Sequence, residues 1–420
     1  MAGSPSVDAV RCCIAGGGPA GMMLGFLLAR AGVDVVVLEK HADFLRDFRG
    51  DTVHPSTLEA IAELGLIDAF LQRPHQDMTQ LGGVVNGQRV VVAEFAQLRA
   101  RYPFIALMPQ WDFLNFIAEH AARYPGFRLL MQAEVTDLLI TGGTIAGVRV
   151  RTPEGPREIR ADLVVGADGR HSTVRTAAGL RIKDLGAPID VLWMRLSKRP
   201  GDPGMTLGYF NSGRGLVTLD RGGYWQCGLV IRKGGFDGLR TRGLEALYAE
   251  IVALAPFLGD RMHELQTWDD VKLLTVRIDR LRRWYRPRLL CIGDAAHAMS
   301  PMGGVGINLA VQDAIAAANV LAGPLRDRAV TPQHLAQIEH RRTWPTVATQ
   351  TLQVLLGRVV FGRAPRPLAV AGPPQRTQAL PLALRIVRRF PALRRIPARI
   401  VGIGFRPEHI RTPEIAEAAP

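Results

Sequence analysis

The chain has 420 residues, of which 47% are hydrophobic and 21% are charged. These values are close to the average of globular proteins and exclude a wholly disordered chain, and the length predicts two to three domains. The formal net charge of +14 points by its sign to nucleic acid or an anionic membrane as a partner.

The positive charge is concentrated in one segment near the C-terminus. Residues 361–411 contain eleven arginines and a single acidic residue, Glu408, and so carry +10. Residues 412–420 carry −2, which leaves +6 for residues 1–360. We therefore expect no nucleic-acid partner, and the charge becomes a question about what the C-terminal segment contacts.

The cysteine content indicates in which redox compartment the protein works. Four cysteines are too few and too scattered for a disulfide framework, and none has the C-x-x-C spacing of a zinc site. They predict a reduced, cytoplasmic protein without a bound metal. No secretory signal and no run of about 18 apolar residues occurs, so we expect neither secretion nor a membrane span.

The first chemical motif lies close to the N-terminus. Ala9–Ala15 predicts a strand, Met22–Ala31 predicts a helix, and a glycine-rich turn joins them. Such a turn lets a helix N-terminus with free backbone N–H groups approach a pyrophosphate, and its last glycine permits close packing of helix and strand. The residues that we expect at a dinucleotide cofactor are Gly16, Gly18, Pro19, Ala20 and Gly21.

A second strand, Val33–Leu38, follows the helix and is succeeded by Glu39 and Lys40. A carboxylate at this separation from the glycines is suited to accept hydrogen bonds from a ribose diol. We therefore expect Glu39 at the cofactor, with Lys40 beside it. NAD and FAD share the adenosine half that such a site binds, so the motif alone leaves both open.

Two later segments narrow the choice. Residues 160–175 contain a strand that ends in Gly166-Ala167-Asp168-Gly169, and residues 289–309 contain a strand followed by Gly293-Asp294 and Gly304-Val305-Gly306-Ile307-Asn308. With the first motif, they make the chain resemble the flavoprotein aromatic hydroxylases, the single-component FAD-dependent monooxygenases of the p-hydroxybenzoate hydroxylase type. The resemblance implies an α/β fold with a Rossmann-like FAD-binding domain, an inserted antiparallel-sheet substrate domain and a C-terminal helical segment.

We expect a discontinuous FAD-binding domain in residues 1–75, 98–185 and 277–345, a substrate domain in residues 76–97 and 186–276, and a basic helical segment in residues 346–420. The substrate domain is predicted to contain a hairpin with its turn at Asn86-Gly87 and a helix near Leu244–Leu254. Its other predicted strands are Ile189–Ser197, Met205–Asn211, Gly215–Asp220 and Tyr224–Arg232. The candidate substrate contacts are Trp193, Tyr209, Phe210, Trp225, Cys227 and Pro301.

The resemblance also implies further cofactor contacts. Glycines before the predicted helix Ile307–Leu321 would let a flavin ring approach the backbone, and the helix N-terminus would stabilise the negative charge of the reduced flavin. The implied contacts are Arg49, Gln110, Asp168, Asp294, Gly304, Gly306, Ile307 and Asn308.

Three of the singled-out positions have structural alternatives. Asp168 could instead cap a turn and pair with Arg175. His54, in the same sequence pattern as Arg49, is the candidate catalytic residue, with helix capping or packing as its alternative. His297 is expected to be structural rather than an acid or base.

The implied reaction uses NADH or NADPH to reduce FAD, after which O2 forms a C4a-hydroperoxyflavin and one oxygen atom enters an aromatic or polycyclic, apolar substrate. No second G-x-G-x-x-G is present, so the nicotinamide co-substrate is expected to bind transiently. The alternatives are a flavin-dependent reductase or desaturase of a polyprenyl or polyketide-like substrate, and a non-enzymatic basic protein with a vestigial flavin fold. We expect a monomer or homodimer.

The C-terminal segment combines charge with apolar residues. His334–Gly357 predicts a helix, and prolines at 365, 367, 373 and 374 predict a linker. Leu380–Phe390 and Leu393–Ile403 then interleave arginines with apolar residues. This part either covers the FAD domain or touches an anionic lipid surface, at the inner face of the membrane.

Overall fold

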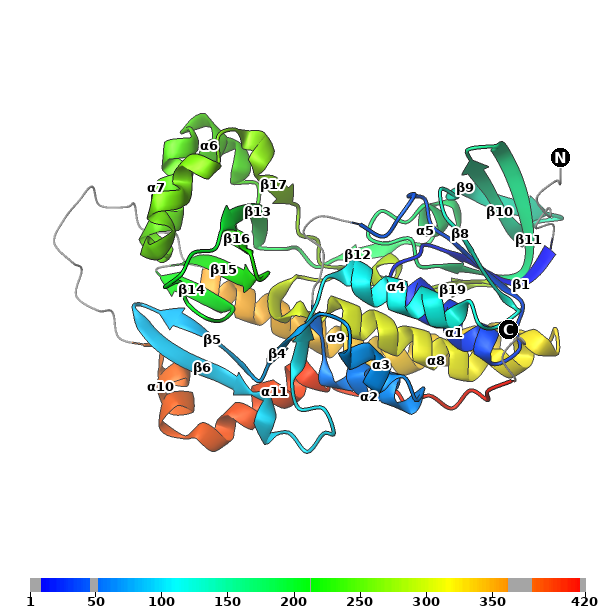
Figure 1. The fold of residues 1–420 in the computed structure, drawn as a ribbon. Coiled ribbons are helices and arrows are strands. Elements are labelled where there is room, and N and C mark those ends of the chain that lie inside the picture. The colour runs from blue at the N-terminus through cyan, green and yellow to red at the C-terminus, as the bar shows by residue number, and fades with distance from the viewer. Residues whose placement is uncertain (1–8, 46–51, 212, 362–379, 416–420) are drawn as a thin grey trace.

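The computed structural model describes residues 9–45, 52–211, 213–361 and 380–415. Two sheets lie toward opposite ends of the molecule, and helices α8 (Gly306–Arg326) and α9 (Pro332–Phe361) run lengthwise beside them (Figure 1). The expected α/β architecture, with two sheets and C-terminal helices, is confirmed.

The first sheet is built around the apolar strand β1. Strand β1 pairs in parallel with β2 and β11, and these pair in parallel with β8 and β20. Antiparallel strands extend the sheet, because β10 pairs with β11 and β9, and β19 pairs with β20. The bounds are β1 Ala9–Ala15, β2 Val35–Leu38, β8 Phe127–Leu130, β9 Glu134–Thr141, β10 Thr144–Thr152, β11 Gly155–Gly166, β19 Tyr285–Arg286 and β20 Leu289–Cys291.

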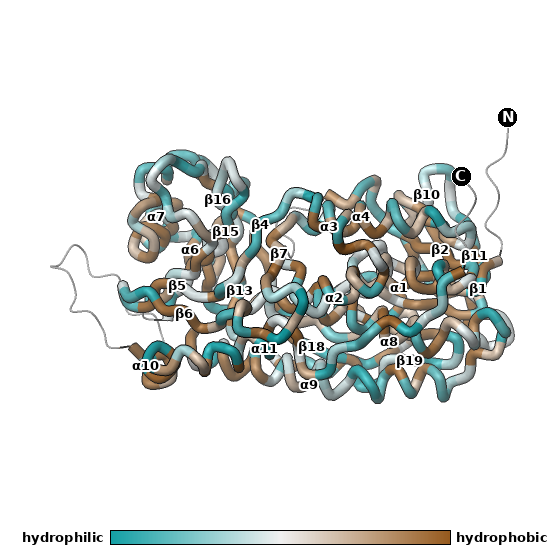
Figure 2. Tube along the Cα trace, turned by 60° about the horizontal axis from the view of Figure 1, so that its bottom comes forward, coloured by the Kyte–Doolittle hydropathy of each residue, from teal (hydrophilic) through white to brown (hydrophobic). Residues whose placement is uncertain are grey.

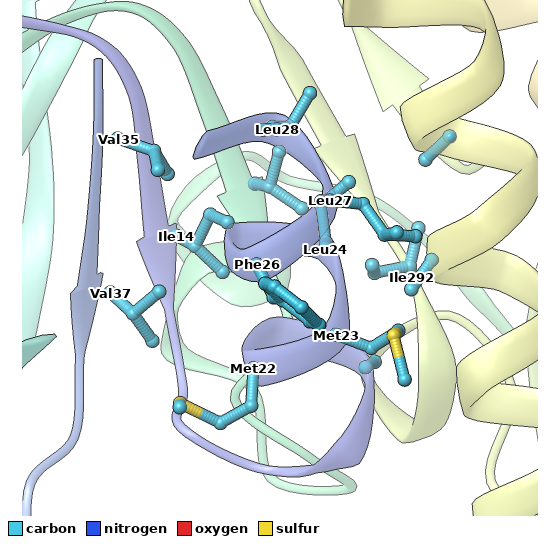
Figure 3. Packing of buried hydrophobic residues seen from close by; sticks show 14 of the residues in the cluster. Ile14, Met22, Met23, Leu24, Phe26, Leu27, Leu28, Val35, Val37 and Ile292 are labelled. Atoms are coloured by element: carbon cyan, nitrogen blue, oxygen red, sulfur yellow. The ribbon is translucent and has the colours of Figure 1, made fainter. Parts of the chain in front are cut away.

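Helix α1 (Pro19–Arg30) lies between this sheet and α8. Figure 3 shows Ile14 and Val37 of the sheet on one side of α1, with Ile292 on the other. Every residue of α1 after Pro19 is buried, which explains why the helix is apolar on all sides. This packing fixes the glycine turn at the edge of the sheet.

Helix α8 is apolar enough to resemble a membrane span. In the described part of the chain, Met302–Arg326 is the helix that passes that test by length and composition, and 83% of its most apolar window is buried inside the protein. A core helix of a folded domain passes the same test, and packing against α1 accounts for its composition.

The second sheet has the strand order β17-β13-β16-β15-β14-β5-β6. The hairpin β5–β6 turns at Asn86 and Gly87, which both have positive φ (50° and 77°), and β5 pairs in parallel with β14. The Asn-Gly turn predicted from the sequence is therefore present. The bounds are β5 Gln80–Val85, β6 Gln88–Glu94, β13 Ile189–Ser197, β14 Leu207–Asn211, β15 Arg214–Asp220, β16 Tyr224–Arg232 and β17 Lys272–Leu274.

Shorter elements join these parts. A three-stranded sheet has the order β3-β7-β4, and β12 pairs with β18. Their bounds are β3 Thr52–Val53, β4 Gln76–Met78, β7 Ile105–Leu107, β12 Ile182–Asp184 and β18 Asp279–Leu281. The remaining α-helices before α8 are α2 Pro55–Glu63, α3 Ile67–Leu71, α4 Gln110–Ala121, α5 Thr173–Ala177, α6 Phe236–Thr241 and α7 Leu244–Leu254.

The C-terminal part returns along the whole molecule. Helix α10 (Leu382–Arg389), a 3-10 helix (Pro391–Arg394) and α11 (Arg395–Gly402) contact β6, and residues 403–415 then reach α1. Helix α9 runs through Pro345 without a break, as does the predicted helix His334–Gly357, so the domain boundary expected after residue 345 falls within a helix. The predicted proline linker lies outside the described residues.

Candidate functional site

The glycine turn after β1 has no room for side chains at two positions. A Cβ at Gly16, whose φ is +106°, would lie 2.4 Å from the carbonyl oxygen of Ala167, and a Cβ at Gly21 would lie 1.9 Å from the carbonyl oxygen of Gly16. At Gly18 no atom lies within 4 Å of a Cβ. Helix α1 starts at Pro19, followed by the buried Ala20. The turn is therefore closed toward the protein and open at Gly18.

Glu39 lies over this turn. Its Oε2 accepts a hydrogen bond from the backbone N–H of Gly17 (3.1 Å), and its Oε1 accepts one from the N–H of His41 (3.1 Å). Lys40, the next residue, is exposed. The carboxylate is thus held beside the glycine turn, where a ribose would lie.

Asp168 stands at the end of β11, next to the same turn. Its Oδ2 accepts the N–H of Val174 (3.1 Å), whereas its buried Oδ1 has no hydrogen-bond partner among the described residues. Burial raises the pKa of this carboxyl. The capping alternative is therefore present, and one oxygen remains available to a donor such as a hydroxyl group.

Arg175 does not pair with Asp168. Its guanidinium donates to the carbonyl oxygens of Arg170 (2.8 Å) and Ala295 (3.2 Å) and lies 3.9 Å from the Asp279 carboxylate. Arg175 thus connects the segment 160–175 to the segment 289–309. Asp294, in the second segment, is one-third exposed and lies 3.6 Å from Arg170.

The loop before α8 is shaped by glycines. Gly303 and Gly304 have φ of +81° and +65°, and a Cβ at Gly304 would lie 2.3 Å from Thr52 Oγ1. Gly306, at the first turn of α8, has no atom within 4 Å of its Cβ position. Pro301, predicted as a substrate contact, is exposed just before this loop.

Two of the residues at the start of α8 are buried. Ile307 packs in the main core, and Asn308 is 2% exposed. The Oδ1 atom of Asn308 accepts hydrogen bonds from Ser56 (2.7 Å) and Thr57 (2.8 Å) of α2. The side chain of Asn308 therefore joins α2 to α8 through this atom.

His54 precedes α2 and is fully buried. Its Nδ1 lies 2.8 Å from the carbonyl oxygen of Val401 in α11, and its Nε2 lies 3.1 Å from the carbonyl oxygen of Gly304. Burial lowers the pKa of His54 to about 4. The imidazole lies between the loop before α8 and α11. It is neutral at pH 7 and carries a single N–H, so it can donate to one of these two carbonyl oxygens.

Thr52 is a site residue that the sequence did not single out. Its Oγ1 donates to the carbonyl oxygen of Gly304 (2.8 Å) and lies 3.2 Å from His54 Nε2. A lone threonine two residues before a histidine carries no recognisable signal. Gln110 is the first residue of α4, as expected, and Arg49 lies outside the described residues.

The aromatic candidates fall on two faces of the second sheet. Tyr209, Trp225 and Cys227 pack in the core beneath α7 and the following 3-10 helix. Trp193 lies on the opposite face, in a cluster that includes Val354 of α9. The three residues beneath α7 therefore lie on the face of the sheet opposite Trp193, where they are part of the core.

Phe210 lies on the same face as Trp193 and stacks in a tilted arrangement against Phe361 at the end of α9 (centroids 6.3 Å apart). Trp193 covers Gly228 of β16, where a Cβ would lie 2.8 Å from the indole ring. Trp193 and Phe210 are consequently the aromatic substrate candidates on the face that points toward α9.

A buried charge network lies behind the loop. Asp313 of α8 accepts from His297 Nε2 (2.5 Å), from the Gly293 N–H (3.1 Å) and from Arg342 Nε (2.8 Å). Burial alone would raise the pKa of Asp313, but the neighbouring His297 and Arg342 hold it below its usual value. The expectation that His297 is structural agrees with this position. Asp313 was not singled out from the sequence, although a lone acidic residue in the apolar helix α8 could have indicated it.

These residues fit an FAD molecule. The open position at Gly18 leaves space for a pyrophosphate, Glu39 can accept from a ribose, and the orphaned Asp168 Oδ1 can accept from a hydroxyl group. The N-terminus of α8, preceded by glycines, suits a planar ring that gains negative charge. The fold and this site define a Rossmann-type flavoprotein.

The family is shown by comparison with known proteins. Residues 9–353 match the family model described as "FAD binding domain". The chain belongs to this family. The relatives that it matches are FAD-dependent aromatic monooxygenases of the p-hydroxybenzoate hydroxylase type. The resemblance inferred from the sequence is therefore confirmed.

Individual relatives extend over nearly the whole chain. A 6-methylpretetramide 4-monooxygenase of Streptomyces rimosus is 32% identical, over 97% of this chain and 96% of the relative. A rifampicin monooxygenase of Streptomyces venezuelae is 28% identical, over 85% and 73% of the two chains. The solved structure of p-nitrophenol 4-monooxygenase PnpA of Pseudomonas putida has a TM-score of 0.71 at 22% identity and covers 92% of this chain and 99% of its own.

This protein is an FAD-dependent monooxygenase that uses an aromatic substrate and O2. Bound FAD supplies the electron transfer and the activation of oxygen. The protein binds and orients the substrate and shields the reaction from water. Within the described residues no group of three or more His, Cys, Asp or Glu side chains could hold a metal ion.

Proposed function

We propose that the protein hydroxylates a polycyclic aromatic substrate with electrons from NADH or NADPH. The observation that carries the proposal is the 32% identity to 6-methylpretetramide 4-monooxygenase over 97% of this chain. A fold neighbour, the anhydrotetracycline hydroxylase OxyS of Streptomyces rimosus, covers 94% of the chain with a TM-score of 0.72. Both names point to a substrate of fused rings.

The substrate is proposed to lie between the second sheet and the loop before α8. Trp193 offers an apolar surface on the side of the sheet that meets α9, and Phe210 packs against Phe361 on the same side. An apolar enclosure excludes water, which protects reactive oxygen species from unproductive decay. If FAD binds as proposed, the N-terminus of α8 would stabilise negative charge on its ring by about 0.3–2 kcal/mol, depending on burial.

The proposed cofactor contacts follow the sequence expectation. The set comprises the glycine turn with Pro19 and Ala20, Glu39, Lys40, Arg49, Gln110, Asp168, Asp294 and the segment from Gly304 to Asn308. Asn308 would act through its backbone, because its side-chain Oδ1 accepts from α2.

His54 is proposed as a positioning residue rather than a base. Its two ring nitrogens face carbonyl oxygens of Val401 and Gly304, so no lone pair is directed at a substrate. It would hold the backbone of Gly304, in the loop that we expect to contact FAD. A general base would instead have to reach the substrate within hydrogen-bond distance.

The nicotinamide co-substrate is proposed to bind transiently, since the sequence has one dinucleotide fingerprint, which FAD takes. A cytoplasmic location and a monomeric or homodimeric state complete the proposal.

The test is a reaction of the purified, FAD-loaded protein with NADH or NADPH, isotope-labelled O2 and a panel of fused-ring phenols. A hydroxylase consumes oxygen and reduced nicotinamide in equal amounts and places one labelled oxygen atom in the product. The alternative reductase or desaturase would give a product without the label. Formation of hydrogen peroxide alone with every fused-ring compound would contradict the proposed substrate class.

A further inference from the structure

The C-terminal helices expose large apolar side chains on the outside of the molecule. Figure 2 shows hydrophobic residues along α10 at the end of the protein remote from the first sheet. The side chains form an apolar ridge, which consists of Leu382 (64% exposed), Ile386 (41%), Phe390 (55%), Leu393 (36%) and Ile396 (56%).

The spacing of the ridge follows the helix period. Leu382, Ile386 and Phe390 are separated by four residues each, so they lie along one side of α10 and its C-terminal end. The other side of α10 contacts β6, where Arg388 donates to Gln88 (2.8 Å). The ridge is therefore the outward side of a helix whose inward side is already occupied.

Positive charge surrounds the ridge. Residues 380–407 contain seven arginines and no acidic residue. Arg385 and Arg389 flank the ridge on α10, Arg395 and Arg399 follow on α11, and all four are exposed. No ion pair joins these four side chains to an acidic residue in the described ranges. Their charge is thus free to meet an external anion.

The exposed apolar side chains together with the arginines around them indicate what kind of partner the ridge can bind. A second copy that docked by the same surface would bring two sets of arginines together, at an electrostatic cost. An anionic bilayer instead offers phosphates to the arginines and a hydrocarbon boundary to the apolar side chains. The remaining tail does not compete for the ridge, because α11 and residues 403–415 pack inward on β6, α9 and α1.

We propose that the apolar ridge docks on the surface of an anionic lipid bilayer. The arginines contact lipid phosphates, and the five apolar side chains enter the interface between headgroups and acyl chains. This contact is independent of the proposed substrate and adds a location to the enzyme.

The test is sedimentation of the full-length, FAD-loaded protein with vesicles of phosphatidylcholine alone or mixed with phosphatidylglycerol. We expect binding to the anionic vesicles that decreases as salt is raised, and little binding to the neutral ones. Arg385→Gln and Arg389→Gln should each weaken binding about fivefold. The double variant Ile386→Ser/Phe390→Ser should weaken it by on the order of tenfold or more.

The matched control is Ile140→Ser, which removes an apolar side chain of similar exposure (58%) from β9, on the first sheet. It should bind vesicles as the parent does. All variants should keep FAD and their melting temperature, because the substituted side chains point outward. Equal binding of the Ile386/Phe390 variant and the parent, or no binding to anionic vesicles at low salt, would overturn the proposal.

Capture of a purified acidic protein in place of the vesicles would also overturn it in favour of a protein partner. Truncation of the tail is a poor substitute for these point variants, because α11 and Glu408 belong to the core.

Discussion

His54 lies between a carbonyl oxygen of α11 and one of the loop before α8, without contact to solvent. Burial holds its folded-state pKa near 4, below the ordinary value of 6.5. The unfolded chain therefore binds a proton more readily than the folded one between these two pH values. The stability that depends on a neutral His54 is complete above about pH 6.5 and is lost as the pH falls toward 4.

We expect His54→Gln to flatten the pH dependence of unfolding. In the parent this group removes about 3 kcal/mol of stability between pH 6.5 and 4, estimated at 1.36 kcal/mol per pKa unit. The measurement is urea unfolding of both proteins across that range. If the two proteins lose stability in parallel as the pH falls, His54 is not the titrating group.

Asp313 is the second residue whose replacement should be costly. Asp313→Asn removes the buried carboxylate that pairs with Arg342 and hydrogen-bonds to His297, so we expect a loss of about 3–5 kcal/mol in the free energy of unfolding. The control is Glu158→Gln in the exposed pair with Arg149, which should cost less than about 1 kcal/mol. Denaturant unfolding compares them. Similar small losses in both variants would show that burial does not amplify the Asp313 interactions.

Strand β1, its glycine turn and α1 form the element that we propose to bind the pyrophosphate. Two glycines of this turn should respond differently to the same substitution. Gly21→Ala places a methyl group 1.9 Å from a backbone oxygen and should destabilise the apo-protein by about 1–3 kcal/mol or more. Gly18→Ala meets no atom within 4 Å and should fold normally. It should nevertheless lower FAD affinity, by on the order of tenfold, because the methyl group lies where a phosphate would approach.

Thermal unfolding without FAD and fluorescence titration with FAD separate these two effects. The interpretation of the turn is refuted if Gly18→Ala binds FAD as tightly as the parent, or if Gly21→Ala unfolds at the parent temperature.

At this scale the sequence was most informative where the pattern is local. Two strands and one helix have the predicted bounds: Ile189–Ser197, Tyr224–Arg232 and Leu244–Leu254. Alternation of apolar and polar residues marks a strand, and turn residues mark where strands and helices end. Which face of a strand meets α7 depends on tertiary packing. For that reason Tyr209 and Trp225 could not be separated from Trp193 by sequence.

Contacts between residues far apart in the chain could not be predicted from a single sequence either. His54 and Val401 are 347 residues apart, and nothing in either local pattern indicates that they meet. The glycine turn could be predicted because its backbone geometry requires glycine at particular positions. Thr52 contributes only one hydroxyl group, and a single threonine forms no pattern that marks it as a site residue.

At the scale of the whole molecule, the C-terminal segment is part of the core. Glu408 is buried and pairs with Arg341 (2.7 Å), and Glu414 pairs with Arg30 of α1 (2.8 Å). Removal of residues 381–420 would leave these arginines without partners and would uncover the cluster around Phe95.

We therefore expect the shortened chain to lose FAD and to unfold at a lower temperature, or to aggregate. The outward variant Ile386→Ser/Phe390→Ser serves as the control, since it should retain the parent melting temperature. A shortened protein that keeps both FAD and the parent melting temperature would mean that the tail is dispensable for the fold.

The return of the tail to α1 also has a consequence for synthesis. The backbone N–H of Ile415 donates to the carbonyl oxygen of Arg30 (2.9 Å), so helix α1, which is made early, is joined to a segment that is made much later (Figure 1). Until residues 401–408 have been synthesised, Val401 cannot contact His54 and Glu408 cannot contact Arg342. The loop before α8 consequently acquires this support late in synthesis, and shorter nascent chains expose surfaces that chaperones bind.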